Sequence, residues 1–301
     1  MSIYLVVYDK ITIGLFSVIT SYYASVTMQY GTLSSFSNTF SMVKANVIRI
    51  TEMFSKIKSR KSMTIKENSP VSLEISDCRL EYSSKVIENL KLTDGKVYGI
   101  IGLSGTGKTS LLNAILGDKS GISGTITVNS HDSDAYDFNQ IISIQNQESS
   151  VLNDTVRMNI IMGYKFDETL YNRIVNDLDI NTLAQREENV GINGGSLSGG
   201  EKQKVAFARF LYSLNYNRIA ILDEPFANMD LISKKKCLQI LGEYVRPEHL
   251  VLFISHNISD LLKISSEYLV FEEDGRVIKY TKENISESAV AEKLLGISNE
   301  E

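Results

Sequence analysis

Apolar residues near the N-terminus recur at alternating intervals of three and four positions, the spacing that places them on one face of an α-helix. They are Leu33, Phe36, Phe40, Val43, Val47, Ile50, Phe54 and Ile57. Asp, Glu, Lys and Arg are absent from Ile11 to Val43, and a helix over that stretch would be about 50 Å long, more than a bilayer core requires. The pattern therefore predicts one long helix within residues 1–60.

Two interpretations of this helix stay open. Hydroxyl and amide residues are frequent in it, which is typical of a helix packed among other membrane helices rather than a lone span in lipid. Lys44 and Arg49 follow the uncharged stretch, and positive residues beyond an apolar segment indicate a cytoplasmic end. The alternative is a soluble amphipathic helix with a solvated basic tip. The polar run 61–70, which ends in Pro70, is predicted to be a linker.

Further along, a short apolar run at 97–101 leads into a glycine-rich loop and then into apolar residues at helical spacing, which predicts a strand, a loop and a helix. The loop is Gly102, Leu103, Ser104, Gly105, Thr106, Gly107, Lys108, Thr109 and Ser110. It fits G-x-x-x-x-G-K-[ST], in which backbone N–H groups and the helix N-terminus bind phosphate oxygens. Lys108 would reach the β- and γ-phosphates, and Thr109 would ligate Mg²⁺.

A second apolar run, 219–222, ends in Asp223, Glu224 and Pro225. Open α/β sheets bind ligands at the C-terminal ends of their strands, so Asp223 is placed to hold Mg²⁺ and Glu224 to polarise an attacking water. Taken alone, the run is more often a strand that ends in a polar turn. A phosphate loop in the same chain favours the functional interpretation.

Between these motifs lies the segment LSGGEKQ, residues 197–203, followed by an apolar helix signal. Gly199 and Gly200 offer a second close approach to phosphate at a helix start, and Ser198 offers a hydroxyl. The simpler alternative is that Ser198 only caps an ordinary helix.

Composition narrows these possibilities further. Hydrophobic residues make up 43% and charged residues 22% of the 301 residues, as in folded globular proteins. The net charge of −5 argues against a general nucleic-acid binder. Cys78 and Cys237 are far apart, which indicates reduced thiols rather than a metal site. No secretory signal is recognisable.

The motifs GLSGTGKTS, LSGGEKQ and IAILDEP, in this order, resemble the nucleotide-binding domain of ABC transporters over about residues 71–280. The resemblance implies an α/β fold of the phosphate-loop NTPase class, with a mixed sheet core at 71–281 and a helical subdomain at about 150–213. A C-terminal tail, 282–301, would follow. The N-terminal helix is similar to the last transmembrane helix of an ABC exporter half.

The resemblance assigns four more positions. Gln147 matches the glutamine that senses Mg²⁺ and contacts the membrane domain, with Gln145 as the neighbouring alternative. His256 matches the histidine that contacts the γ-phosphate, and Asp230 the loop that touches the opposite subunit. Tyr82 occupies the position of the aromatic residue that stacks on adenine. His131 and His249 match nothing and are expected at the surface.

The family's architecture implies a head-to-tail dimer of two ABC ATPase domains, in which each ATP lies between the phosphate loop of one and Ser198, Gly199 and Gly200 of the other. Glu224 would be the general base, with Mg²⁺ and Lys108 holding the developing charge. Another chain would supply the remaining membrane helices, with the ATPase domain on the cytoplasmic side of the cell membrane. Ile192 stands where family exporters usually carry a glutamate that contacts the membrane domain. The rival functions are a soluble ABC clamp or regulator and a truncated exporter fragment without transport activity.

Overall fold

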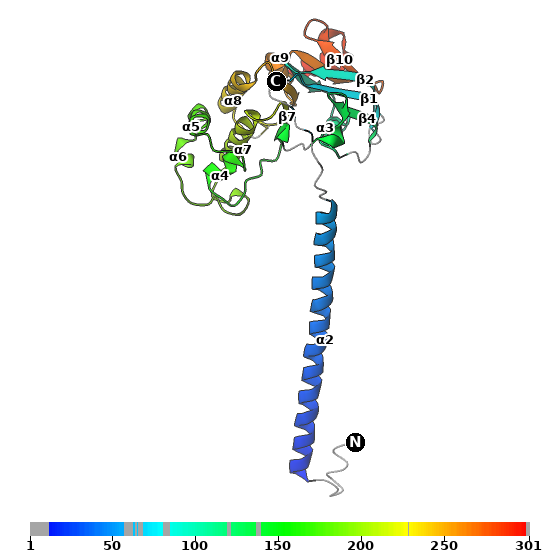
Figure 1. Ribbon diagram of the computed structural model, residues 1–301, viewed down its shortest axis with the longest axis vertical. Coiled ribbons are helices and arrows are strands. Elements are labelled where there is room, and N and C mark those ends of the chain that lie inside the picture. The colour runs from blue at the N-terminus through cyan, green and yellow to red at the C-terminus, as the bar shows by residue number, and fades with distance from the viewer. Residues whose placement is uncertain are drawn as a thin grey trace. The chain divides into compact units, whose positions relative to one another are not determined.

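The structure is a computed structural model that describes residues 12–56, 63, 65, 69–80, 85–118, 122–136, 140–227 and 229–298. It divides the chain into two compact units, Met1–Arg60 and Lys61–Glu301. Figure 1 shows both units, with some of their helices and strands labelled. Each unit is described by itself.

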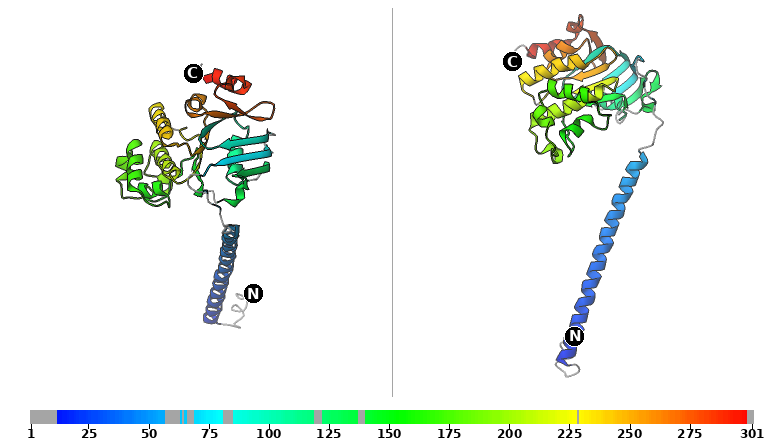
Figure 2. Two further views of the ribbon diagram at one scale, coloured as in Figure 1. Left: turned by 45° about the horizontal axis from the view of Figure 1, so that its top comes forward. Right: turned by 60° about the vertical axis from the view of Figure 1, so that its left-hand side comes forward.

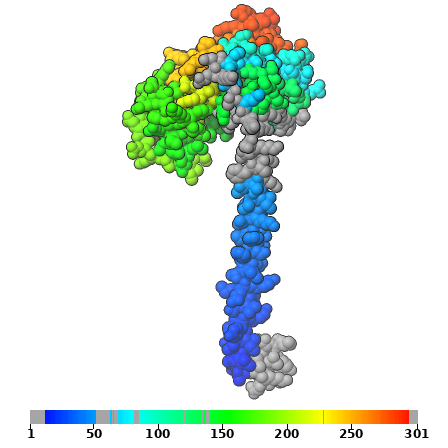
Figure 3. Space-filling model, viewed as in Figure 1, coloured from blue at the N-terminus to red at the C-terminus, as the bar shows by residue number. Residues whose placement is uncertain are grey.

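The described residues of the first unit form the helix α2 (Ile13–Lys56), of 44 residues, which confirms the predicted long helix. Its hydroxyl side chains donate to backbone carbonyls one turn earlier, for example Thr27 to Tyr23 at 2.8 Å and Thr39 to Ser35 at 3.0 Å. These hydroxyl groups are therefore satisfied within the helix itself. Phe36 and Phe40, neighbours on the predicted apolar face, stack at 6.4 Å between ring centroids. Figure 3 shows the side chains of α2 standing out along its length.

Within the described residues, no helix combines the length and the apolar character needed to cross a membrane.

The second unit is built on a six-stranded sheet in the order β10-β9-β3-β8-β7-β6. Its strands are β3 (Lys96–Ile101), β6 (Ile142–Gln145), β7 (Ile219–Asp223), β8 (Leu250–Ile254), β9 (Glu267–Phe271) and β10 (Val277–Thr281). All neighbours pair in parallel except β9 and β10. Both faces are covered, because Ile219 and Ile221 pack into one core while Ala220 and Leu222 pack into the other. This is why the parallel strands are continuous apolar runs.

An antiparallel sheet, β2-β1-β4-β5, completes the first core. It consists of β1 (Ser72–Leu80), β2 (Lys85–Thr93), β4 (Ile122–Val128) and β5 (His131–Asp132), and a 3₁₀ turn, η1 (Ser133–Ala135), follows. Helix α3 (Lys108–Ile115) contributes Leu111, Leu112 and Ile115 to the same core. The helix that begins at the glycine-rich loop is thus held by apolar residues of both sheets.

Helices cover the other face of the six-stranded sheet. They are α4 (Val156–Ile161), α5 (Glu168–Asp177), α6 (Asn181–Ala184), α7 (Gly199–Leu214), α8 (Leu231–Tyr244), α9 (Ile258–Ile264) and α10 (Ala289–Ser298), with 3₁₀ turns η3 (Ile192–Gly194) and η4 (Ile285–Glu287). Helices α4 to α7 form a lobe beside the sheets, green in Figures 1 and 3. In the part predicted to be a tail, Ile285, Val290 and Ala291 are buried in this second core, and Figure 2 shows α10 beside the C-terminal strands.

Candidate nucleotide-binding site

The glycine-rich loop leaves the C-terminal end of β3 and enters α3. Gly105 and Gly107 have φ angles of 77° and 98°, in the left-handed region that glycine adopts at low cost. A Cβ on Gly102 would lie 2.8 Å from the Cβ of Phe271, so a larger residue does not fit there. The predicted strand, loop and helix are therefore present, and the loop has the backbone freedom that close approach to phosphate requires.

Lys108 lies in the curve of this loop. Its ammonium group donates to the carbonyl oxygens of Gly102 and Leu103 at 2.7 and 2.9 Å. Burial lowers the pKa of Lys108, and the carboxylates of Glu224 and Asp223 act in the opposite direction. Because the cation is held by neutral oxygens, a phosphate group in the loop would gain a charge-assisted hydrogen bond with it.

Asp223 ends β7 and faces the start of α3. The hydroxyl of Thr109 donates to Oδ2 of Asp223 at 3.3 Å. Burial raises the pKa of Asp223, and the hydrogen bond from Thr109 opposes this rise. A hydroxyl and a carboxylate oxygen side by side are oxygen donors of the kind that Mg²⁺ prefers.

Glu224 has a strained backbone, with a φ of 48° that non-glycine residues rarely adopt. Its N–H donates to the carbonyl oxygen of Ile254, the last residue of β8, at 3.0 Å. Its Oε1 lies 2.6 Å from Nε2 of His256, and the side chains of Glu224 and His256 are 11% and 68% exposed. The turn therefore directs a largely buried carboxylate toward an exposed imidazole that comes from the neighbouring strand.

Most of these groups, though not Asp223, Gly102 or Leu103, line one cavity of about 340 Å³, within the range of small-molecule sites. Its lining consists of Ser104, Gly105, Thr106, Gly107, Lys108, Thr109, Ser110, Gln147, Glu224, Ile254 and His256. Gln147 is exposed and lines the cavity, whereas Gln145 is 3% exposed in the core. Of the two glutamines that the sequence left open, Gln147 is the one that lies beside the loop.

The segment LSGG lies elsewhere. Ser198 caps α7 in a capping box with Glu201, because its hydroxyl accepts from the N–H of Glu201 at 3.3 Å and its own N–H donates to Oε2 of Glu201 at 2.7 Å. These bonds lower the pKa of Glu201. Ser198, Gly199 and Gly200 are exposed, and the described lining of the cavity includes none of them. The simple cap that the sequence allowed is therefore present.

Asp230 also caps a helix outside the described lining. It accepts from the N–H groups of Ile232 and Ser233 at the start of α8, both at 3.0 Å. The bonds to Ser233 lower the pKa of Asp230. Its exposed position leaves this end of α8 accessible to a second molecule.

One structurally important residue belongs to none of the sequence motifs. Asn159 on α4 is 0% exposed, and its side chain binds the backbone of Leu152 twice, at 2.8 and 3.0 Å. Arg209 on α7 donates from Nη2 to Oδ1 of Asn159 at 2.9 Å and from Nη1 to the carbonyl oxygen of Ser150 at 3.0 Å. The two residues anchor the segment that follows Gln147. An asparagine within a helix, where it is a poor helix former, is the one signal that the sequence offers.

Of the two histidines expected at the surface, one is exposed and the other is buried. His131 is exposed as expected, but the expectation for His249 is wrong, because His249 is 3% exposed. Its Nδ1 accepts from the N–H of Arg246 at 3.0 Å, and burial lowers its pKa to about 4. Tyr82, the predicted adenine contact, lies outside the described residues.

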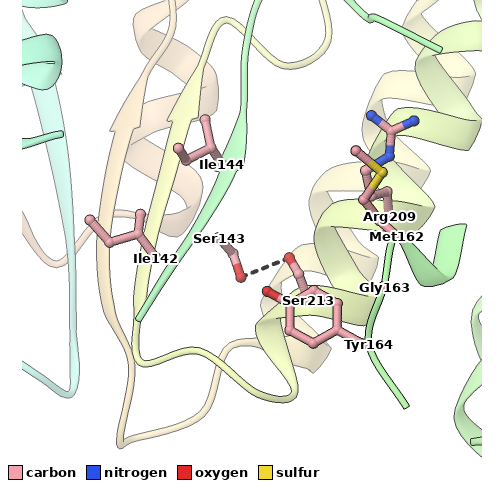
Figure 4. A pocket seen from close by; sticks show the side chains of 8 residues that line it. All are labelled: Ile142, Ser143, Ile144, Met162, Gly163, Tyr164, Arg209 and Ser213. Atoms are coloured by element: carbon pink, nitrogen blue, oxygen red, sulfur yellow. Dashed lines mark hydrogen bonds between the residues drawn. The ribbon is translucent and has the colours of Figure 1, made fainter. Parts of the chain in front are cut away.

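A second cavity, of about 490 Å³, lies between the edge strand β6 and the helices. Figure 4 shows Ile142, Ser143 and Ile144 on one side, facing Met162, Gly163, Tyr164, Arg209 and Ser213. Within this cavity, the hydroxyl of Ser213 donates to the hydroxyl oxygen of Ser143 at 2.8 Å. Strand β6 leads directly into the segment of Gln147, which lines the phosphate-loop cavity.

A largely parallel sheet that presents a glycine-rich loop after β3 and a carboxylate pair after β7, with β8 between these strands, defines the class of phosphate-loop nucleotide-binding proteins. Residues 87–227 match the sequence profile of a family described as ABC transporter. An export ATP-binding/permease protein of Rickettsia typhi is 31% identical over 223 residues, which are 69% of this chain and 38% of that protein. The chain thus contains an ATP-binding domain of the ABC transporter family, and its homologues are export ATP-binding/permease proteins.

Two further relatives extend the comparison. A lactococcin transport/processing ATP-binding protein, LcnC-like, of Lactococcus lactis is 28% identical over 91% of this chain and 40% of its own length. The chain therefore spans about two fifths of the length of these curated relatives. A solved structure of a bacterial Atm1-family ABC exporter with ATP bound superposes with a TM-score of 0.68, at 21% identity, over 85% of this chain and 48% of that one. It shares the fold.

Proposed function

We propose that the chain hydrolyses ATP and that this hydrolysis powers export across a membrane. The observation that carries the proposal is the carboxylate of Glu224, which lines the same cavity as the phosphate loop. A carboxylate at this position repels a bound triphosphate. Its presence is explained if it activates the water that attacks the γ-phosphate.

In this mechanism Lys108 and the loop N–H groups hold the triphosphate in line with a water bound to Glu224. Glu224 accepts a proton as the water attacks, and His256, 2.6 Å from Glu224, keeps the carboxylate oriented and contacts the γ-phosphate. Thr109, Asp223 and Gln147 would hold Mg²⁺, which supplies positive charge at the phosphate oxygens. Tyr82 would stack on the adenine.

We further propose that two such domains act as a head-to-tail dimer. Ser198, Gly199 and Gly200 would bind the γ-phosphate of the ATP held by the partner, and Asp230 would touch the opposite subunit. The exposed position of both helix starts supports this arrangement.

The membrane part is proposed to come from α2 together with another chain that supplies further helices. The match to the Lactococcus lactis protein covers a larger share of this chain than Lys61–Glu301 makes up, and so extends into the first unit. The cavity beside β6 would be the docking site for that chain, because a displacement of β6 would also displace the segment that contains Gln147. The ATPase domain would then face the cytoplasm.

Two measurements on the full chain test the proposal. In Glu224→Gln, ATP binding is expected to stay intact while hydrolysis falls by about 100-fold or more, since a general base typically contributes at least that factor. Hydrolysis at the normal rate would show that Glu224 is not the base. Fractionation of cells should recover the chain with membranes and a co-purifying membrane chain. Complete recovery in the soluble fraction would instead favour a soluble ABC clamp or regulator.

A further inference from the structure

An ion pair connects the first turns of α8 and α9, two helices close to the nucleotide site. Nζ of Lys234, on α8, contacts Oδ2 of Asp260, on α9. The two side chains are only 18% and 6% exposed. Exposed ion pairs contribute little to a fold, whereas removal of one partner of a buried pair leaves an uncompensated charge. Separation of the two helix starts would therefore leave a largely buried carboxylate without its countercharge.

The loops that precede these helices carry site residues. Lys234 lies one turn after Asp230, the N-cap of α8. Asp260 lies one turn after His256, and Asn257 between them is the N-cap of α9. The side chain of His256 is 68% exposed, so little packing holds it. Its position must follow from the backbone that leads into α9.

Lys234 also reaches the site itself. It lines a cavity of about 210 Å³ whose wall includes Glu224, Pro225, Phe226, His256 and Asn257. A displacement of Lys234 relative to Asp260 would therefore change the same space in which Glu224 and His256 meet.

We propose that Lys234 and Asp260 are positioning residues for ATP hydrolysis, because their ion pair keeps the start of α9 against the start of α8 and thereby holds His256 at Glu224. The inference rests on the proposed function, in which Glu224 activates water. In the proposed dimer, the ion pair connects the loop of Asp230, which faces the second domain, to His256 of the same copy. The pair acts on turnover rather than on ATP binding, since neither residue lines the phosphate-loop cavity.

The test compares kcat and KM for ATP in the full-length wild type, Lys234→Met, Lys234→Arg and Lys236→Met. Lys236 is the matched control, because it lies on the same helix and pairs with Asp179 at the surface, with side chains 45% and 71% exposed. Lys234→Met should lower kcat at least about tenfold with KM within about twofold, since small misplacements of catalytic groups cost rate. Lys234→Arg should keep at least about half of the wild-type kcat, because it preserves the charge. Lys236→Met should leave both constants unchanged.

Asp260→Asn provides a second variant of nearly unchanged shape in case Lys234→Met does not fold, and it too should lower kcat without raising KM. Addition of Lys234→Met to Glu224→Gln should leave the Kd for ATP unchanged.

Folded Lys234→Met or Asp260→Asn with the wild-type kcat would overturn the inference, as would a loss that appears equally in Lys236→Met. If the wild type itself does not hydrolyse ATP, the proposed function fails together with the inference. If the wild type and Lys234→Met hydrolyse ATP equally, only the inference fails.

Discussion

Asn159 connects the segment after Gln147 to the helical lobe, and its replacement by alanine measures that connection. Oδ1 accepts from the N–H of Leu152 at 2.8 Å and from Arg209 at 2.9 Å. Nδ2 donates to the carbonyl oxygens of Leu152 and Thr155, both at 3.0 Å. The side chain is 0% exposed, so alanine removes all of these bonds from a buried position.

The cost can be worked out from these bonds. The three bonds to neutral backbone groups contribute about 1 kcal/mol each, and the bond to the charged Arg209 about 1.5–3 kcal/mol. Arg209 keeps two other bonds, to the carbonyl oxygens of Asn159 and Ser150, which reduces its loss. We therefore expect Asn159→Ala to lower the free energy of unfolding by about 4 kcal/mol, near the upper end of what single substitutions do.

Urea unfolding followed by near-ultraviolet circular dichroism is a suitable assay, because the chain has 15 tyrosines and no tryptophan. Tyr98, Tyr212 and Tyr268 are fully buried in the second unit and report its packing. The control is Asn215→Ala, which removes one exposed bond from Arg246 at 3.0 Å and should change the free energy of unfolding by less than about 0.5 kcal/mol. A loss below about 1 kcal/mol in Asn159→Ala would refute the reasoning, because a single neutral bond accounts for that much.

Two further variants test a buried base and an exposed glycine. Because burial lowers the pKa of His249 to about 4, the unfolded chain binds a proton below pH about 6.5 and the folded chain does not, so the free energy of unfolding falls from pH about 6.5 to about 4. In His249→Asn, whose Oδ1 can accept from the N–H of Arg246, that fall should be smaller by up to about 3 kcal/mol; unchanged pH dependence in urea unfolding would contradict it. Gly200→Ala should keep the free energy of unfolding or raise it by up to about 0.5 kcal/mol, yet lower kcat for ATP at least about tenfold. A stable Gly200→Ala variant with full activity would be the contrary result.

Local patterns made the nucleotide loop predictable. The apolar run before Gly102, the glycines of the loop and the helical spacing after Lys108 each depend on near neighbours in the sequence, and the structure brings them together as expected. The long helix α2 was predictable for the same reason, since one period governs its whole apolar face.

Burial that depends on distant partners was not predictable. His249 lies in a polar stretch between α8 and β8, and its burial follows from contacts with α5 and α7, as its shared cavity with Leu170, Leu211 and Leu214 indicates. The choice between Gln145 and Gln147 stayed open because it depends on where β6 ends, and strand ends are the least certain part of a sequence-based prediction. Asn159 escaped notice because its charged partner, Arg209, is 50 positions away in the sequence and becomes a neighbour only in the fold.

The glycines after Ser198 differ from those of the phosphate loop in their physical reason. Gly102 has to be glycine because Phe271 leaves no room for a Cβ, and Gly105 because its φ is positive. At Gly199 and Gly200 a Cβ would meet nothing within 4 Å and φ is not positive, so alanine fits there and would favour the helix. Packing among the described residues therefore does not explain either glycine. Close approach of another molecule does, since a bare helix N-terminus can receive an anion at short range, and the ATP held by a second domain is the molecule that the proposed dimer brings there.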